Sequence, residues 1–532
     1  MPRPNILLLH TDQQRFDTIA ALGAAHMHTP GIDRLVERGT AFTCAYSANP
    51  VCQPARHDLI TGVSARHHGY WSNANQSIQD YSLATLPRLL TDAGYQTIAV
   101  GKMHFQPDRE HHGFAHMHLM EELPSCREDD TYLQYLERVG CSHIRCQHGV
   151  RPLFYHTPQE SRVPEEHHGS AWIAHQTIDL LRQDRDRPLF IFASWVGPHP
   201  PYYVPRKYLD MYASGDLPAP CGPGDPDTQF RTPISPEDAD PERLRHIRGG
   251  YFGATSLIDA QIGRILDILE ETGQLNNTLI LFTTDHGEML GDRGHYQKHY
   301  PYEGSAHIPL IACGPGFARD LCSIPATTWD VAATILDAAE IAPPEGHPLV
   351  GRPLGSITGD QERIISFHHG TGARRYVATV GLGHKYIHWY NGGYDELYDL
   401  EADPWEQNNL AGSRADIEGA LRRAALGFER DHGPVERISD DTFADLDYQA
   451  PDPHACSLYP RWSSTQFPRW TNGYSEKDLE LIRQEMRDCL KDPHAYICTE
   501  DDWRAEAMEK WEQIGGDRKF YEELFAEVDK RQ

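Results

Sequence analysis

Short apolar runs alternate with longer amphipathic segments through the first two thirds of the chain. The first run, Ile6-Leu7-Leu8-Leu9, is continuously apolar, which is typical of a strand buried on both faces of a parallel sheet. In residues 258–269, apolar side chains recur at the spacing of a helix that packs on such a sheet. The pattern predicts strands at 5–9, 97–100, 189–193 and 279–283, and helices at 86–90, 173–181 and 258–269. This alternation indicates an α/β domain.

The pattern changes near residue 361. Three β-type runs with turns between them, at 364–367, 376–380 and 385–390, predict a small antiparallel sheet. Beyond about residue 440 the chain is first irregular and then has the periodicity of helices, at 476–489 and 502–530. We therefore expect a large α/β domain over 1–360, a smaller antiparallel-sheet subdomain over 361–440 and an extension with helices over 441–532.

Composition disfavours several kinds of partner. The chain has 532 residues, with 49 Lys and Arg against 77 Asp and Glu, and its formal net charge is −28. This charge disfavours general binding to nucleic acid or to an anionic membrane, so an anionic ligand needs a local basic pocket. The eleven cysteines form no CxxC pair, and the sequence has no recognisable secretory signal or membrane-spanning run. We expect a cytoplasmic protein with mostly reduced thiols, although a chain trimmed of its leader would look the same.

The run Cys52-Gln53-Pro54-Ala55-Arg56 has the pattern C-x-P-x-R. Proline is favoured in the first turn of a helix, where its missing N–H costs nothing, so the run predicts a helix that begins near Cys52. A helix N-terminus favours an anion, which suits a sulfate or phosphate ester. A pattern with three fixed positions also occurs by chance around ordinary buried cysteines, so further residues must decide.

Polar residues follow two of the predicted strands directly. Asp12 and Gln13 come after the first apolar run, and Asp285 and His286 come after the strand at 279–283. The carboxyl ends of parallel strands meet at one edge of a sheet, where ligands bind, so both pairs are expected to converge on one ion. Each aspartate could instead cap a following helix. Two such pairs beside the other motifs favour the ion site.

Basic side chains are also found next to predicted strands. Lys102 and His104 follow the strand at 97–100, His199 follows the strand at 189–193, and Lys298 lies thirteen residues after Asp285. A single Lys-x-His pair is usually a surface feature, and a single histidine is more often structural. Together with Arg56, however, these residues would give an acidic protein a cationic pocket for an anionic ester.

The motifs occur in the order found in sulfatases, over roughly the first 410 residues. The chain resembles that family in its C-x-P-x-R signature, its G-K-x-H and P-H-x-P elements and the stretch Leu397-Tyr398-Asp399-Leu400. The resemblance implies an alkaline-phosphatase-like α/β fold: a mixed sheet flanked by helices, with a smaller C-terminal α+β subdomain and a helical tail. It also implies a sulfuric ester hydrolase in which a formylglycine-generating system oxidises Cys52 to formylglycine, whose hydrate supplies the nucleophile.

The resemblance also implies a metal site. The ion would be held by Asp12, Gln13, Asp285, His286 and an oxygen of the modified residue 52. Oxygen-rich donors favour a hard cation, so Ca²⁺ is expected. His286 stands where many sulfatases carry Asn, and an imidazole suits Mn²⁺ or Zn²⁺ better, so both ions remain alternatives.

The remaining residues receive roles in the reaction from the same resemblance. Arg56 would hold the hydrated aldehyde, and His104 would take a proton from its second hydroxyl as sulfate is expelled. His199, helped by Lys298, would protonate the departing alcohol. The sulfate group would be held by Lys102, His199, Lys298 and Asn73, or by the nearby Asn75 in place of Asn73.

Two other functions stay open. The pair Asp12-Gln13 with Asp285-His286 also resembles phosphonate monoester hydrolases and choline-sulfatase-like enzymes, so a phosphonate monoester or a phosphodiester is the alternative substrate. Lys102 and His104 favour a sulfate ester. A catalytically inactive scaffold is the less favoured alternative, because every proposed reacting residue is present. The expected partner is a small-molecule sulfate ester, and a homo-oligomer is possible, because the aromatic-bearing helices of the tail could pack on a neighbouring subunit.

Overall fold

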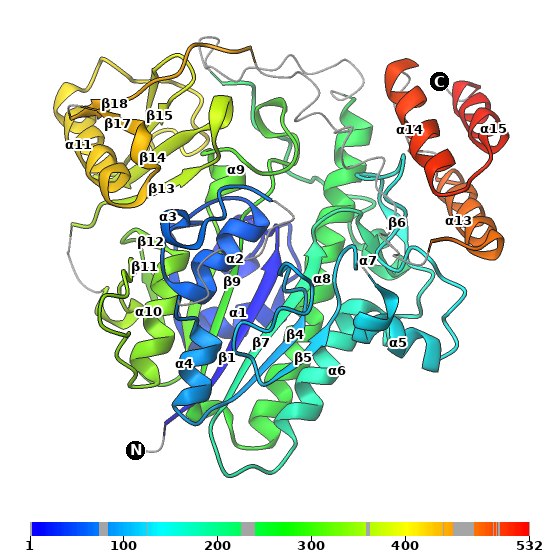
Figure 1. Cartoon of the computed structure of the whole chain (residues 1–532), viewed down its shortest axis with the longest axis horizontal. Helices are drawn as coiled ribbons and strands as arrows, with labels where there is room; N and C mark the ends of the chain where they lie inside the picture. Colours follow the sequence, from blue (N-terminus) through cyan, green and yellow to red (C-terminus); the bar gives the residue numbers. More distant parts are fainter. Residues whose placement is uncertain are drawn as a thin grey trace.

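A mixed eight-stranded sheet forms the centre of the molecule (Figure 1). The computed structural model describes residues 3–73, 83–124, 126–224, 240–357, 362–439, 441–450, 473–492, 494–495, 497 and 501–530. The strands of the sheet are β1 (Asn5–Asp12), β2 (Thr40–Phe42), β4 (Gln96–Gly101), β5 (His116–Leu119), β7 (Leu189–Pro198), β9 (Thr278–Thr284), β10 (Leu310–Cys313) and β11 (Asp320–Cys322). Their order is β11-β2-β10-β9-β1-β7-β4-β5.

Strand β1 lies between β9 and β7 and is parallel to both, with Leu8 opposite Leu281 on one side and Phe192 on the other. Strands β4 and β5 continue the parallel part, whereas β10 is antiparallel to both β9 and β2. All four predicted strands are confirmed, and they are neighbours in the order β9-β1-β7-β4. Their carboxyl ends therefore meet at one edge of the sheet.

Helices cover both faces of the sheet. One face carries α1 (Pro30–Arg38), α5 (Thr131–Arg138), α6 (Gly169–Leu181) and α8 (Pro241–Glu271), and the other carries α2 (Cys52–Thr61), α4 (Leu86–Asp92) and α10 (Thr328–Ala338). Successive strand residues point to opposite faces. Leu7 accordingly shares a core cluster with Ile262 of α8, and Leu8 shares another with Ile335 of α10. Burial on both sides explains the continuous apolar runs, and the three predicted helices are confirmed within α4, α6 and α8.

A four-stranded antiparallel sheet follows, as predicted. Its strands are β13 (Ile365–His369), β14 (Tyr376–Gly381), β15 (His384–Trp389) and β16 (Tyr394–Asp399), and one face is covered by α11 (Ala415–His432). Leu397 and Tyr398 belong to β16, so the C-terminal family stretch is part of this sheet. The shorter elements of the chain are β3 (Ala45–Tyr46), β6 (Gln159–Glu160), β8 (Tyr203–Val204), β12 (Ala326–Thr327), β17 (Ile438–Ser439), β18 (Thr442–Phe443), α3 (Ala65–His68), α7 (Arg206–Met211) and α9 (Glu303–Ala306).

The C-terminal helices pack on their own chain. They are α13 (Glu476–Cys489), α14 (Asp501–Gln513) and α15 (Arg518–Asp529), and the last two replace the single stretch predicted at 502–530. Gly515, at a φ of 93°, lies in the turn between α14 and α15. Their core includes Val150 and Phe154 from a loop of the first domain. The domain limits at 360 and 440 stay predictions. No helix in the described part of the chain is long and apolar enough to cross a membrane.

Candidate active site

Two neighbouring strand ends bring Asp12, Gln13, Asp285 and His286 together. Strands β1 and β9 are paired up to Thr11 and Thr284, so the residues that follow leave the sheet side by side. The backbone N–H of Gln13 donates to Asp285 Oδ1 at 3.0 Å, and so does that of His286. The structure thus places both predicted pairs at one point, for the reason expected from parallel strands.

Cys52 reaches this point as the first residue of α2. Val51 before it is extended, and Pro54 lies in the first turn, where a missing N–H is tolerated. The Sγ atom of Cys52 lies 3.2 Å from His286 Nε2. Asn73 accepts a hydrogen bond from the backbone N–H of Gln53 at 3.0 Å, so its side chain lies at the same helix terminus. Asn75 lies outside the described residues.

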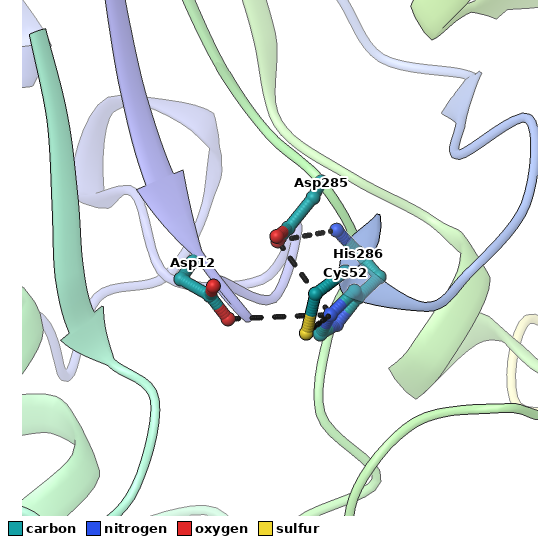
Figure 2. A group of neighbouring side chains, drawn as sticks. All are labelled: Asp12, Cys52, Asp285 and His286. Carbon is teal, nitrogen blue, oxygen red and sulfur yellow. Dashed lines mark hydrogen bonds and ion pairs between the residues drawn. The ribbon is translucent and has the colours of Figure 1, made fainter. Parts of the chain in front are cut away.

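Asp12, Cys52, Asp285 and His286 form a buried group with the donors that a divalent cation needs (Figure 2). Each offers one ligand atom, and these atoms lie within 4.8 Å of one another. Asp12 Oδ1 is buried and accepts no hydrogen bond from the described residues. His286 Nδ1 lies 2.9 Å from the carbonyl oxygen of Gly287, which can only accept, so the proton is on Nδ1 and the Nε2 lone pair faces the group. The donor set fits a metal ion.

Gln13 lies beside this group in a strained conformation. Its φ is 68°, which is uncommon for a residue with a side chain, and its carbonyl accepts a hydrogen bond from Tyr251 Oη at 2.7 Å. Its side-chain oxygen accepts from Lys298 Nζ at 2.6 Å, while its amide nitrogen donates to Glu288. Gln13 therefore connects the metal-binding group to Lys298.

Arg56 and Lys102 compensate the two aspartates. The Arg56 guanidinium contacts Asp285 Oδ2 at 3.0 Å and Asp12 Oδ2 at 3.1 Å, and Lys102 Nζ lies 2.7 Å from Asp12 Oδ2. Burial alone would raise the pKa of Asp285, but the basic groups around it, Arg56 among them, hold this pKa below its ordinary value. Burial and the charge of Asp285 would raise the pKa of Asp12. The cations around Asp12, Lys102 first, keep this pKa below its ordinary value. Both carboxylates are therefore ionised at neutral pH.

The glycine before Lys102 is needed for this arrangement. Gly101 has a φ of 96°, and a Cβ atom there would lie 2.0 Å from the carbonyl oxygen of Ser194 on the neighbouring strand. Ser194 Oγ also accepts a hydrogen bond from Arg56 Nη1 at 3.0 Å. The close approach of β4 and β7 therefore sets the position of Lys102, which explains the glycine of the G-K-x-H element.

His199 and Lys298 form a hydrogen-bonded pair. His199 Nδ1 donates to the carbonyl of Pro200 at 2.7 Å, so the Nε2 lone pair accepts from Lys298 Nζ at 3.0 Å. Burial holds the pKa of His199 well below its usual value, and Lys298 and Lys102 lower it further. Burial would also lower the pKa of Lys298, but the acidic groups around it, Asp12 among them, raise it above its ordinary value. In this pair the available proton is therefore on Lys298.

His104 is held differently from the other predicted residues. Its φ is 57°, and its backbone N–H donates to Glu121 Oε1 at 3.0 Å, which fixes the turn after β4. Its Nδ1 is buried and forms no hydrogen bond with the described residues. This ring nitrogen is available to a bound molecule.

Sequence reasoning missed Glu122 and Arg151. Glu122 lies 2.6 Å from Lys102 Nζ and 3.5 Å from His199 Nδ1, and it also pairs with Arg151. Burial would raise the pKa of Glu122, but Arg151 and the other cations hold it well below its usual value. The strand-end rule could have found Glu122, which follows β5 closely, but β5 is too short and polar to be recognised. Arg151 lies in a loop and has no sequence signal.

Comparison with known proteins identifies the family. A model described as Sulfatase matches residues 4–341. An arylsulfatase of Clostridium perfringens is 31% identical over 453 residues, covering 77% of this chain and 91% of that protein. A choline-sulfatase of Rhizobium meliloti is 29% identical over 468 residues, covering 84% of this chain and 86% of that protein. The structure of a phosphonate monoester hydrolase of Agrobacterium radiobacter matches with a TM-score of 0.66 and 25% identity. The match covers 81% of this chain and 96% of that one. The chain therefore belongs to the sulfatase family, whose members are hydrolases of the alkaline phosphatase superfamily.

Proposed function

We propose that this protein hydrolyses a sulfate monoester to an alcohol and inorganic sulfate, using formylglycine at position 52 and a divalent cation. The observation that carries the proposal is the position of Cys52, whose Sγ lies 3.2 Å from His286 in a buried group with Asp12 and Asp285. A sulfate ester has negative oxygens that repel a nucleophile, so its hydrolysis requires a cation and basic side chains around the attacking atom. The surroundings of Cys52 supply both.

The metal would be held by Asp12, Gln13, Asp285, His286 and residue 52. When bound, the ion polarises the sulfate group and lowers the pKa of an adjacent hydroxyl. Two ionised carboxylates and an amide oxygen favour Ca²⁺. The His286 imidazole is the one donor that favours Mn²⁺ or Zn²⁺ instead, so metal analysis of the purified protein distinguishes these alternatives.

Arg56 fixes the position of the nucleophile. The hydrated aldehyde supplies two hydroxyls on one carbon: one attacks sulfur, and the other allows sulfate to leave by elimination. Arg56 is fully buried and is held by Asp12, Asp285 and Ser194, so its guanidinium is oriented before substrate binds. Such preorganisation means that little reorganisation accompanies the reaction.

Lys102, Lys298 and His199 are the proposed sulfate-binding side chains. All three are buried, and Lys102 and Lys298 are held charged by the acidic groups around them. They supply the local positive field that a protein with a net charge of −28 otherwise lacks. Asn73 completes this proposed set at the N-terminus of α2.

Proton transfer to the departing alcohol is proposed to begin at Lys298. The Nε2 atom of His199 carries a lone pair at rest, so it must gain a proton before it can act as an acid. Lys298 Nζ donates to this atom and is the nearest source. Glu122, 3.5 Å from His199 Nδ1, stabilises the imidazolium that results. His199 then gives the Nε2 proton to the leaving oxygen and returns to its neutral form.

His104 is the proposed base for the release of sulfate. Its buried Nδ1 forms no hydrogen bond with the described residues, so it can accept a proton from the remaining hydroxyl of residue 52. The positive φ of His104 and its backbone bond to Glu121 orient the turn that carries the ring.

The alternative is hydrolysis of a phosphonate monoester or a phosphodiester. It is favoured by His286 and by the similarity to a phosphonate monoester hydrolase at 25% identity. Lys102 and His104 favour the sulfate ester. The test is the value of kcat/KM for 4-nitrophenyl sulfate divided by that for 4-nitrophenyl phenylphosphonate, measured on protein whose aldehyde content is known. A ratio well above one is expected, and a ratio well below one would replace the proposal by its alternative.

A panel of aryl, sugar, choline-type and alkyl sulfates would then identify the alcohol.

An inactive scaffold protein is the third possible function. Mass analysis of a tryptic peptide that spans Cys52, from the native host, would support that reading if the cysteine stays unmodified. The cytoplasmic location and the oligomeric state stay predictions.

A further inference from the structure

Glu485 is a buried residue of the C-terminal helix α13, and only 3% of it is exposed. Its two carboxylate oxygens accept hydrogen bonds from successive backbone N–H groups, that of Arg145 at 2.8 Å and that of Cys146 at 2.9 Å. Both residues belong to the Arg151 loop, residues 139–158, which connects α5 to β6. Hydrogen bonds to a carboxylate are stronger than those between neutral groups. Glu485 therefore holds the Arg151 loop against α13.

Cys489 makes a second contact with this part of the chain, one helical turn after Glu485 and on the same face of α13. Its Sγ donates to Gln159 Oε1 at 3.4 Å. Gln159, the first residue of β6, also accepts from the N–H of Val150 at 2.7 Å. It donates to the carbonyls of Val150 and Phe154 at 2.9 and 3.1 Å. Helix α13 is thus joined to the first half of the loop directly and to its second half through Gln159.

Apolar packing joins the same two segments. Three buried loop residues beside Arg151 share a core with three residues of α13: Val150, Leu153 and Phe154 from the loop, and Leu479, Ile482 and Met486 from the helix. In the described part of the chain, the core clusters on the two faces of the central sheet contain none of these loop residues. The position of the backbone at Arg151 is therefore set largely by contacts with the C-terminal helices.

The side chain of Arg151 reaches the candidate active site. It pairs with Glu122, and its guanidinium carbon lies 4.8 Å from the centre of the Tyr155 ring. Glu122 in turn lies 2.6 Å from Lys102 Nζ and 3.5 Å from His199 Nδ1. Glu122 is thus held between cations, and the loss of Arg151 would free it to shift away from His199.

We propose that Glu485 is a positioning residue for the protonation of the leaving group. By holding the loop, it keeps Arg151 against Glu122, and Glu122 in turn beside the His199 imidazole that protonates the departing alcohol. The inference rests on the proposed function, since it assigns a further residue to the same reaction. Among the described residues, Glu485 has no polar contact with these three side chains, so it acts through the loop.

Glu485→Gln tests this role with little change of shape. An amide nitrogen cannot accept a hydrogen bond, so E485Q loses one of the two bonds to the loop. The kcat on an alkyl sulfate is expected to fall about threefold to tenfold, up to the effect of losing one hydrogen bond to a charged group. The kcat on 4-nitrophenyl sulfate should change by less than about twofold, because that leaving group, with a pKa of about 7, needs little protonation.

The comparison of the two esters separates positioning from a merely structural role. A smaller folded fraction would lower both rates by the same factor, so an E485Q variant that leaves the ratio of the two rates unchanged would overturn the proposal. Glu480→Gln is the matched control. Glu480 is also on α13, but it is exposed and pairs with Arg483 and Arg487. E480Q is expected to keep both rates.

A double-mutant cycle tests the route from Glu485 to His199. If Glu485 acts through Glu122, the effect of E485Q on the alkyl sulfate rate should largely disappear when E122Q is already present. Effects of the two changes that multiply in full would show that Glu485 acts by another route, and they would overturn the proposal.

Amide hydrogen exchange separates this proposal from the proposed function, because it needs no turnover. The reporters are the N–H of Val150, which bonds to Gln159, and the N–H of Phe154, which bonds to the carbonyl of Arg151 at 3.3 Å. We expect exchange about fivefold faster or more in E485Q and no change in E480Q. That result supports the positioning of the loop even if the wild type hydrolyses neither a sulfate nor a phosphonate ester. Unchanged exchange in E485Q overturns the proposal, whatever the protein hydrolyses.

Discussion

The proposed metal side and the proposed leaving-group side of the active site are built in different ways. The metal side consists of Asp12, Gln13, Asp285 and His286, all within two residues of the ends of the adjacent parallel strands β1 and β9. The leaving-group side consists of Glu122, Arg151, His199 and Lys298, which come from four separate segments. Strand register alone brings the first set together, whereas contacts distant in sequence bring the second together.

The loop that carries Arg151 illustrates the difference. Val150 and Phe154, on either side of Arg151, pack in one core with Leu479 and Met486 of α13. Helix α13 lies beyond the region matched by the family model, which ends at residue 341. Changes on the metal side should therefore impair the hydrolysis of every sulfate ester, whereas changes on the leaving-group side should depend on the ester.

Cys52→Ala should have the largest effect, because it removes the proposed nucleophile that both sides serve. We expect the rate on every sulfate ester to fall by about 10⁴-fold or more, as it does when other enzymes lose their nucleophile. The small side chain should leave the fold intact, which circular dichroism and the Tm would show. Activity near that of the wild type would refute the role of residue 52.

Asp285→Asn and Asp12→Asn test the metal side next. Each should lose bound metal and reduce the rate on aryl and alkyl sulfates alike, by roughly 10² to 10⁴-fold, because several kcal/mol of charge stabilisation disappear. Metal content after dialysis is the readout. Asp330→Asn is the matched control, since Asp330 is equally buried but caps α10 and pairs with Arg363. If the two metal-side variants retain stoichiometric metal, these carboxylates do not bind it.

His199→Ala should slow the hydrolysis of two kinds of sulfate ester by different factors. The rate on an alkyl or sugar sulfate should fall by ~10² to 10⁴-fold, the usual contribution of an acid catalyst. The rate on 4-nitrophenyl sulfate should fall far less, because that leaving group, with a pKa of about 7, needs little protonation. Arg56→Ala should slow both esters similarly. If His199→Ala also slows the hydrolysis of both esters by the same factor, then His199 only binds sulfate and Lys298 is the acid.

Glu122→Gln should have the smallest effect, about tenfold on alkyl sulfates, the contribution of one hydrogen bond to a charged group. The pKa of Glu122 is held well below its ordinary value of 4.5 by the nearby cations, Arg151 first and Lys102 with it, against the effect of burial. Its ionised form therefore stabilises the fold above about pH 4.5, and this contribution is lost as the pH falls through the lower folded value. The difference in Tm between wild type and E122Q should be largest at neutral pH and shrink in acid. A difference that does not change with pH would contradict this account.

The sequence predicts the four adjacent parallel strands β9, β1, β7 and β4 and the convergence of the proposed metal-side residues at their ends, for a common physical reason. An apolar run such as Leu279-Ile280-Leu281-Phe282 indicates a buried strand, and the polar residues after it must then lie at the sheet edge. Strand β5, His116–Leu119, carries two histidines and is only four residues long, so Glu122 behind it could not be recognised. The protonation of His199 and Lys298 was also beyond prediction, because it depends on the carbonyl of Pro200 and on burial.

Residue 52 is proposed to act as formylglycine, and activity should therefore depend on the aldehyde content of the protein. Preparations made with graded amounts of a formylglycine-generating system should differ only in the converted fraction, which mass spectrometry of the Cys52 peptide measures. We predict that the rate of sulfate ester hydrolysis rises in proportion to that fraction and extrapolates to about zero at no conversion. A rate that is independent of the aldehyde fraction, with fully unconverted protein as active as the rest, would show that residue 52 does not act as formylglycine.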